Sequence, residues 1–179
     1  MKRNITSVLL AAVTLMVIAG VTTALLAGTN LLTKDTIAQR NEEIENETRM
    51  QVLAVDSFEA ATVQVDGEEM TYYKGIKDGQ TVGYVFTITT SGKSSGLVVM
   101  TGVDTKGTVT GVAVTDNNET AGYVDKAEKG GLLDAITGRS SVDGVDTVSQ
   151  ATKTSKGILH GVEGALKAYQ AITGGAADE

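Results

Sequence analysis

The sequence predicts an α+β fold: an N-terminal transmembrane helix, then a small domain with a twisted antiparallel sheet and packed helices. Three observations support this prediction. Residues 4–33 carry no charged side chain, residues 61–114 alternate apolar and polar side chains between glycine-containing turns, and residues 156–171 space apolar side chains as a helix does. At 179 residues the chain has room for one modest domain and an anchor.

The uncharged N-terminal segment is long enough to cross a bilayer, because about 20 apolar residues span the hydrocarbon core. A cleaved signal peptide is the alternative, but the apolar region of such a peptide runs only about 7–15 residues. Lys2 and Arg3 precede the segment, so the positive-inside rule places the N-terminus in the cytoplasm and residues 34–179 outside it. We therefore expect a single-pass protein of the cell membrane with an extracytoplasmic C-terminal domain.

The rest of the chain divides by composition. We expect residues 1–33 to form the cytoplasmic N-terminus and anchor, and residues 34–60 a half-exposed helical stalk. Residues 61–173 form the extracytoplasmic domain, and residues 174–179 a flexible tail. Alternation predicts strands at residues 62–65, 84–88 and 112–114 and a hairpin over residues 96–112, whereas residues 116–131 are expected to form a loop before a short helix at residues 132–136. The chain has no proline, so the turns are assigned to its 21 glycines.

Composition excludes several classes of chemistry. The formal charge of −7 gives a surface that repels nucleic-acid phosphates, and we expect no nucleic-acid partner. The absence of cysteine excludes disulfides, thiolate nucleophiles and iron–sulfur clusters. A single histidine gives little basis for a metal site or a Ser-His-Asp triad, so we expect neither a metal site nor a catalytic side chain.

Hydroxyl side chains gather just before the predicted C-terminal helix, at Ser149, Thr152, Thr154 and Ser155. Such residues commonly cap helices by accepting hydrogen bonds from free backbone N–H groups. A helix N-terminus also favours a phosphate, because it combines unpaired N–H groups with a partial positive charge. From spacing alone both interpretations remain open: a helix cap and a phosphate-binding site.

Three motifs occur in order along the second half of the chain. Residues 96–114 form a glycine-flanked hairpin, residues 118–123 read Asn-Glu-Thr-Ala-Gly-Tyr, and residues 146–152 read Asp-Thr-Val-Ser-Gln-Ala-Thr, with Thr154 and Ser155 following. Over roughly residues 81–169 the chain thus resembles the FMN-binding domain shared by the G subunit of the Rnf complex and the C subunit of the sodium-pumping NADH:quinone oxidoreductase. It departs from that pattern at Gln150, where glycine is usual, at Ala121 in place of proline, and at residues 123–124.

The resemblance implies that a separate flavin transferase esterifies FMN onto Thr152 through its phosphate. Asp146 is then a recognition element for the transferase or a turn-former, and Gln150 adds bulk beside the transferase or the phosphodiester. The cofactor-binding set implied is Thr152, Ser149, Ala151, Lys153, Thr154, Glu119 and Thr120. Glu119 and Thr120 lie beside the flavin or form a solvated turn, and Lys153 lies near the phosphate or is solvated.

The function implied is electron transfer within a membrane-bound, ion-translocating oxidoreductase of Rnf type. FMN supplies the redox chemistry, and other membrane subunits supply the donor, the acceptor and the ion path, so the chain is not a complete enzyme alone. Two alternatives are a free-standing extracytoplasmic FMN shuttle and a cofactor-free surface binding module.

Overall fold

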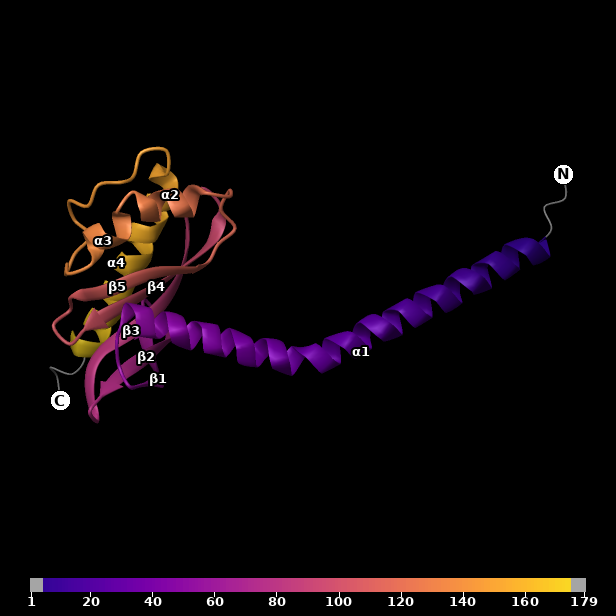
Figure 1. The fold of residues 1–179 in the computed structure, drawn as a ribbon, viewed down its shortest axis with the longest axis horizontal. Coiled ribbons are helices and arrows are strands. Elements are labelled where there is room, and N and C mark those ends of the chain that lie inside the picture. The colour runs from indigo at the N-terminus through magenta and orange to yellow at the C-terminus, as the bar shows by residue number, and fades with distance from the viewer. Residues whose placement is uncertain (1–4, 175–179) are drawn as a thin grey trace. The chain divides into compact units, whose positions relative to one another are not determined.

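The computed structural model describes residues 5–174 of the chain. It divides into two compact units, Met1–Ile44 and Glu45–Glu179. Helix α1 (Ile5–Val52) begins in the first unit and ends in the second (Figure 1). Residues 1–4 and 175–179, which include most of the expected tail, lie outside the description, and Gly174 is the last residue of a helix.

The first unit is helical and contains a candidate membrane span, Val8–Lys34. The side chains of residues 8–27 are all exposed, as lipid-facing side chains are in an isolated helix. Threonine hydroxyls in this segment donate to the carbonyl four residues earlier, for example Thr14 to Leu10 at 2.9 Å and Thr23 to Ala19 at 2.8 Å. Polar groups paired within the helix need no water, which suits a hydrocarbon environment. The predicted N-terminal apolar helix is confirmed.

The second unit is built on a five-stranded antiparallel meander in the order β1-β2-β3-β4-β5. The strands are β1 (Ser57–Val65), β2 (Glu68–Lys77), β3 (Gln80–Ser91), β4 (Ser95–Asp104) and β5 (Val109–Asp116). Asp66-Gly67 and Asp78-Gly79 have positive φ at both residues, the backbone of the two-residue hairpin turns that these dipeptides favour. The predicted antiparallel sheet is confirmed.

Helix α4 (Thr152–Gly174) covers one face of this sheet and forms the main core with it (Figure 1). Ile158 and Val162 of α4 are fully buried in the same cluster as Phe86 and Val99 of the sheet. Gly161 allows this approach, because a Cβ there would lie 2.7 Å from the Cβ of Val99. The structure starts this helix at Thr152, four residues earlier than the apolar spacing predicted.

Two short helices lie between the sheet and α4 in the chain. Helix α3 (Leu132–Ile136) matches the predicted helix, and its Leu132 and Ile136 are buried. Helix α2 (Tyr123–Lys129) contradicts the predicted loop over residues 116–131. It escaped prediction because seven residues between glycines are too few to show a helical period, and Ala127 is its one fully buried side chain.

The opposite face of the sheet holds a smaller cluster made by the end of α1. Val52 and Leu53 pack there with Val85 and Met100, which alternate along their strands with the main-core residues Phe86 and Val99. Here four strand glycines replace side chains: Gly75, Gly83, Gly102 and Gly111. We call these four residues the glycine floor. These glycines make room for the end of α1 and do not form turns. The assignment of every glycine to a turn was therefore wrong.

The glycine floor lets the end of α1 approach the sheet closely. A Cβ at Gly111 would lie 2.8 Å from Val52 Cα, and one at Gly75 would lie 2.5 Å from Leu53 Cδ2. Thr110 Oγ1 donates to the Val52 carbonyl at 2.5 Å, so the last turn of α1 is bonded to the sheet as well as packed on it. The stalk predicted over residues 34–60 therefore ends within the domain: α1 stops at Val52 and β1 starts at Ser57.

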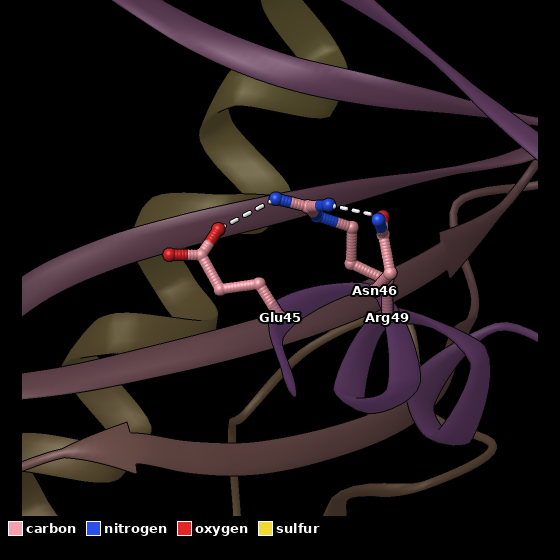
Figure 2. Close-up of polar contacts among 3 residues, drawn as sticks. All are labelled: Glu45, Asn46 and Arg49. Atoms are coloured by element: carbon pink, nitrogen blue, oxygen red, sulfur yellow. Dashed lines mark hydrogen bonds and ion pairs between the residues drawn. The ribbon is translucent and has the colours of Figure 1, made fainter. Parts of the chain in front are cut away.

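Arg49 completes this junction and is only 4% exposed. Figure 2 shows its guanidinium held from its own helix, donating to Glu45 Oε2 at 2.6 Å and to Asn46 Oδ1 at 2.5 Å. Its carbon Cζ lies 3.7 Å from the centroid of the Tyr73 ring on β2, a cation–π contact. The sequence predicted a half-exposed stalk here, and the structure buries this charge instead.

Candidate functional site

The attachment motif lies where the loop after α3 turns into α4. Thr152 is the first residue of α4 and its side chain is exposed, as is that of Lys153. The residues on either side are buried: Ala151 and Thr154 are each 1% exposed, and Ser155 is fully buried. The fold therefore fixes the backbone of this turn and presents the Thr152 hydroxyl outward.

Local hydrogen bonds shape the turn before Thr152. The Ala151 N–H donates to the Val148 carbonyl at 3.1 Å, and the Val148 N–H donates to Ser155 Oγ at 3.2 Å. Gln150 takes a φ of 66°, in the left-handed region that favours glycine. The position where the resembling family usually has glycine is thus one where this backbone requires a positive φ.

Glu119 ties the start of α4 to the sheet. Its Oε2 accepts from Thr154 Oγ1 at 2.7 Å, and its Oε1 accepts from the Ser94 N–H in the β3–β4 turn at 2.8 Å. The turn approaches closely, because a Cβ at Gly92 would lie 2.7 Å from Glu119 Oε1 and 3.0 Å from Thr154 Cα. One carboxylate therefore joins three segments that are far apart in the sequence.

A cavity of about 260 Å³ opens beside Thr152. Its lining residues come from the β3–β4 turn, from α2 and from the motif: Lys93, Tyr123, Gln150, Ala151, Thr152, Lys153 and Thr154. Small-molecule sites usually measure about 300–1,000 Å³ and enclose most of their ligand. At about 260 Å³ this cavity lies below that range.

Positive charge and an aromatic ring meet at this cavity. Lys93 Nζ lies 4.7 Å and Lys126 Nζ 5.5 Å from the centroid of the Tyr123 ring, and Lys126 Nζ donates to Gln150 Oε1 at 3.3 Å. Neither Lys93 nor Lys126 was singled out from the sequence. They carry no motif signal, and only the folded chain brings Lys93 to the cavity and Lys126 to Tyr123 and Gln150, which line it.

A larger hollow of about 490 Å³ lies elsewhere, between the β1–β2 turn and α4. Its lining includes Asp66, Glu68, Glu69 and Glu163. Carboxylates repel a phosphate group, so the smaller cavity suits a phosphorylated cofactor better despite its size.

The remaining predicted site residues do not line the cavity beside Thr152. Thr120 is exposed and does not line the cavity beside Thr152, although its carbonyl accepts from the Tyr123 N–H at 3.2 Å. Ser149 and Asp146 line a neighbouring cavity of about 420 Å³, together with residues of the α2–α3 junction. Asp146 is exposed and makes no hydrogen bond or ion pair within residues 5–174, so nothing in its contacts identifies it as a turn-former.

Comparison with known proteins gives two family matches and several curated relatives. Residues 92–167 match the FMN-binding domain, and residues 1–52 match the RnfG N-terminal region. The G subunit of the Na⁺-translocating ferredoxin:NAD⁺ oxidoreductase complex of Acetobacterium woodii is 32% identical over 90% of this chain and 84% of the relative. The chain belongs to the family of Rnf complex G subunits.

Other G subunits of Rnf-type complexes align over a similar extent. That of the proton-translocating ferredoxin:NAD⁺ oxidoreductase complex of Clostridium ljungdahlii is 26% identical over 84% of this chain and 85% of its own length. That of the ion-translocating oxidoreductase complex of Escherichia coli K12 is 28% identical over 89% of this chain and 83% of its own length. An FMN-binding subunit of a membrane-associated, multi-subunit complex is therefore what the sequence and its relatives support.

The residues at the cavity fit FMN. Thr152 offers an exposed hydroxyl at the N-terminus of a 23-residue helix, where free N–H groups and the helix dipole favour a phosphate. Lys93 and Lys153 add positive charge at the cavity and Lys126 adds it next to Gln150, while Tyr123 offers an aromatic surface to a flavin ring.

Proposed function

We propose that this chain carries electrons through FMN linked to Thr152 by a phosphodiester, as the G subunit of an Rnf-type ion-translocating complex. The observation that carries the proposal is the exposed Thr152 hydroxyl, held between buried neighbours beside a cavity too small to enclose the cofactor. A covalent tether supplies the retention that the open cavity lacks.

Attachment requires a flavin transferase and FAD. The Thr152 oxygen attacks the phosphorus on the riboflavin side of the FAD pyrophosphate, the hydroxyl proton is lost, and AMP leaves. The product is FMN esterified to the chain, with no change in oxidation state. Asp146, exposed and unpaired within residues 5–174, is available to the transferase as a recognition group.

The side chains around Thr152 have separate roles in positioning the turn and binding the cofactor. Glu119 and Thr154 position the turn through their 2.7 Å hydrogen bond, and Ala151 anchors it in the core. Lys153 and the free N–H groups of α4 would hold the phosphate, whereas Thr120 and Ser149 lie outside the cavity beside Thr152. Bound FMN supplies one- and two-electron chemistry, while these residues bind and orient it.

The proposed setting is the outer side of the cell membrane. Lys2 and Arg3 favour a cytoplasmic N-terminus, so that α1 would cross the bilayer once and the domain of residues 45–174 would lie outside. Other membrane subunits of the complex supply the electron donor and acceptor. The match of residues 1–52 to the RnfG N-terminal region favours a complex subunit over a free-standing shuttle.

In-gel flavin fluorescence tests the attachment. The full chain, produced with a flavin transferase, should give a fluorescent band on a denaturing gel, and Thr152→Ala should give a dark band of equal protein amount. Thr115→Ala, which removes an exposed hydroxyl at the end of β5, is the matched control and should stay fluorescent. A dark wild-type band with an active transferase would overturn the proposal and favour a cofactor-free binding module.

A further inference from the structure

The positive charges beside Thr152 lack acidic partners. Among residues 45–174 the salt bridge that forms joins Arg49 to Glu45, and no carboxylate of these residues lies within ion-pair distance of Lys93, Lys126 or Lys153. The chain as a whole carries a formal charge of −7. Lys93 and Lys153 line the cavity, and Lys126 lies beside it, bonded to the cavity residue Gln150. Three ammonium groups gathered here in an acidic protein favour a negatively charged ligand.

Two of these lysines are arranged around an aromatic ring and not around the attachment hydroxyl. Lys93 comes from the β3–β4 turn and Lys126 from α2, yet both Nζ atoms lie within 6 Å of the centroid of the Tyr123 ring. The side-chain oxygen of Gln150 holds Lys126 at 3.3 Å. This residue, which departs from the family pattern, thus has a specific contact: it restrains one of the two charges.

We propose that Lys93, Tyr123 and Lys126 form a cationic-aromatic wall that contacts the flavin ring and favours its reduced form. The proposal rests on the covalent attachment at Thr152 and goes beyond it by assigning residues that tune the potential. Charge near the ring nitrogens is one of the means by which a protein sets flavin electronics. Reduction adds negative charge to the ring system, so nearby ammonium groups stabilise the reduced state more than the oxidised one.

Lys153 has a different place in this arrangement. It follows Thr152 directly on α4, and the cations within reach of the Tyr123 ring in residues 5–174 are Lys93 and Lys126. We assign Lys153 to the phosphate, and the wall to the ring. The two assignments predict different consequences of removing charge: loss at residue 153 affects attachment, and loss at residues 93 and 126 affects the potential.

The test is the midpoint potential of the flavin in the full, flavin-loaded chain, measured by spectroelectrochemistry in detergent. The double variant Lys93→Met and Lys126→Met should lower the ratio of reduced to oxidised flavin about tenfold at a fixed potential, a shift of about 30 mV to more negative values for two electrons. Salt should shrink the difference, because exposed charges are screened beyond about 10 Å at 0.1 M. Lys129→Met, one turn further along α2, is the matched control: among residues 5–174 the cations over the Tyr123 ring are Lys93 and Lys126, so this change should alter the potential little.

A second measurement isolates the aromatic part of the wall. Tyr123→Leu should increase flavin fluorescence in the native protein, because contact with a phenol ring quenches isoalloxazine emission, while denatured samples should match wild type. An unchanged potential in the double lysine variant would overturn the proposal that this wall contacts the flavin ring, whether or not attachment is normal. Reduced attachment with an unchanged potential would instead assign the two lysines to the phosphate. A wild-type chain without covalent flavin would instead overturn the proposed function itself.

Discussion

The two faces of the sheet bury different kinds of structure. The face under α4 is packed with large side chains, among them Phe86, Leu97 and Ile158, and it holds the Thr152 turn at one end. The opposite face carries the glycine floor, on which the backbone of Val52 rests almost directly. One face is filled by large side chains of α4 and the sheet, whereas on the other the end of α1 lies against glycines.

The two faces meet two different requirements of a redox domain that is joined to a membrane helix: one positions the attachment site, and the other holds the helix. A core of interlocking side chains fixes a turn and its exposed hydroxyl, because such interiors are close-packed and resist displacement. A floor without side chains instead joins the domain to the helix that continues into the candidate membrane span. Substitutions on the two faces should therefore separate anchorage from cofactor attachment.

The largest effect is expected at the glycine floor. In Gly102→Ala the new Cβ collides with the Val52 carbonyl oxygen and lies 2.5 Å from Thr110 Oγ1, so a backbone must move. We expect the free energy of unfolding of the full chain, measured by urea titration in detergent, to fall by about 3 kcal/mol. Gly174→Ala, where a Cβ meets nothing within 4 Å, should change it by less than about 0.5 kcal/mol. Equal effects of the two substitutions would show that α1 does not rest on this floor.

A smaller loss is expected from the charge that closes the same junction. Arg49→Ala removes the cation–π contact with Tyr73 and both side-chain hydrogen bonds, and should lower the free energy of unfolding by about 2 kcal/mol. The neighbouring Met50 is 49% exposed, and Met50→Ala should cost less than about 0.5 kcal/mol. Folded protein of both variants should take up flavin as wild type does, and a selective loss of flavin in Arg49→Ala would mean that the two faces are coupled.

The smallest effect has the opposite sign and lies on the Thr152 side. Gln150→Gly relieves a left-handed backbone at φ 66° and should raise the free energy of unfolding by about 1 kcal/mol or less. The same change at Gln170, an exposed position inside α4, should lower it by about 1 kcal/mol. If both substitutions destabilise the chain alike, the Lys126 contact of Gln150 outweighs its backbone strain.

Patterns with a fixed period could be predicted from the sequence. The apolar N-terminal helix, the strands with their Asp-Gly turns, α3 and most of α4 follow from local spacing and composition. The attachment motif was found through resemblance, because Thr152 lies in a segment whose hydroxyls also suit a helix cap.

The arrangement around Thr152 could not be predicted, because its contacts join residues distant in sequence. Thr154 bonds to Glu119, 35 positions away, so a hydroxyl assigned to cofactor binding is buried in a positioning contact. Lys93 reaches the cavity, and Lys126 reaches the Tyr123 ring that lines it, only after the β3–β4 turn and α2 fold against α4. The burial of Arg49 likewise depends on Tyr73, a strand residue that no helical pattern reveals.

The mass of one peptide tests the central claim most directly. Trypsin releases residues 140–153, which contain Thr152, from protein isolated with its transferase active. Covalent attachment predicts that this peptide is heavier by one FMN less one water, and that fragmentation places the addition on Thr152. An unmodified peptide, or an addition on Thr147 or Ser149, would contradict it.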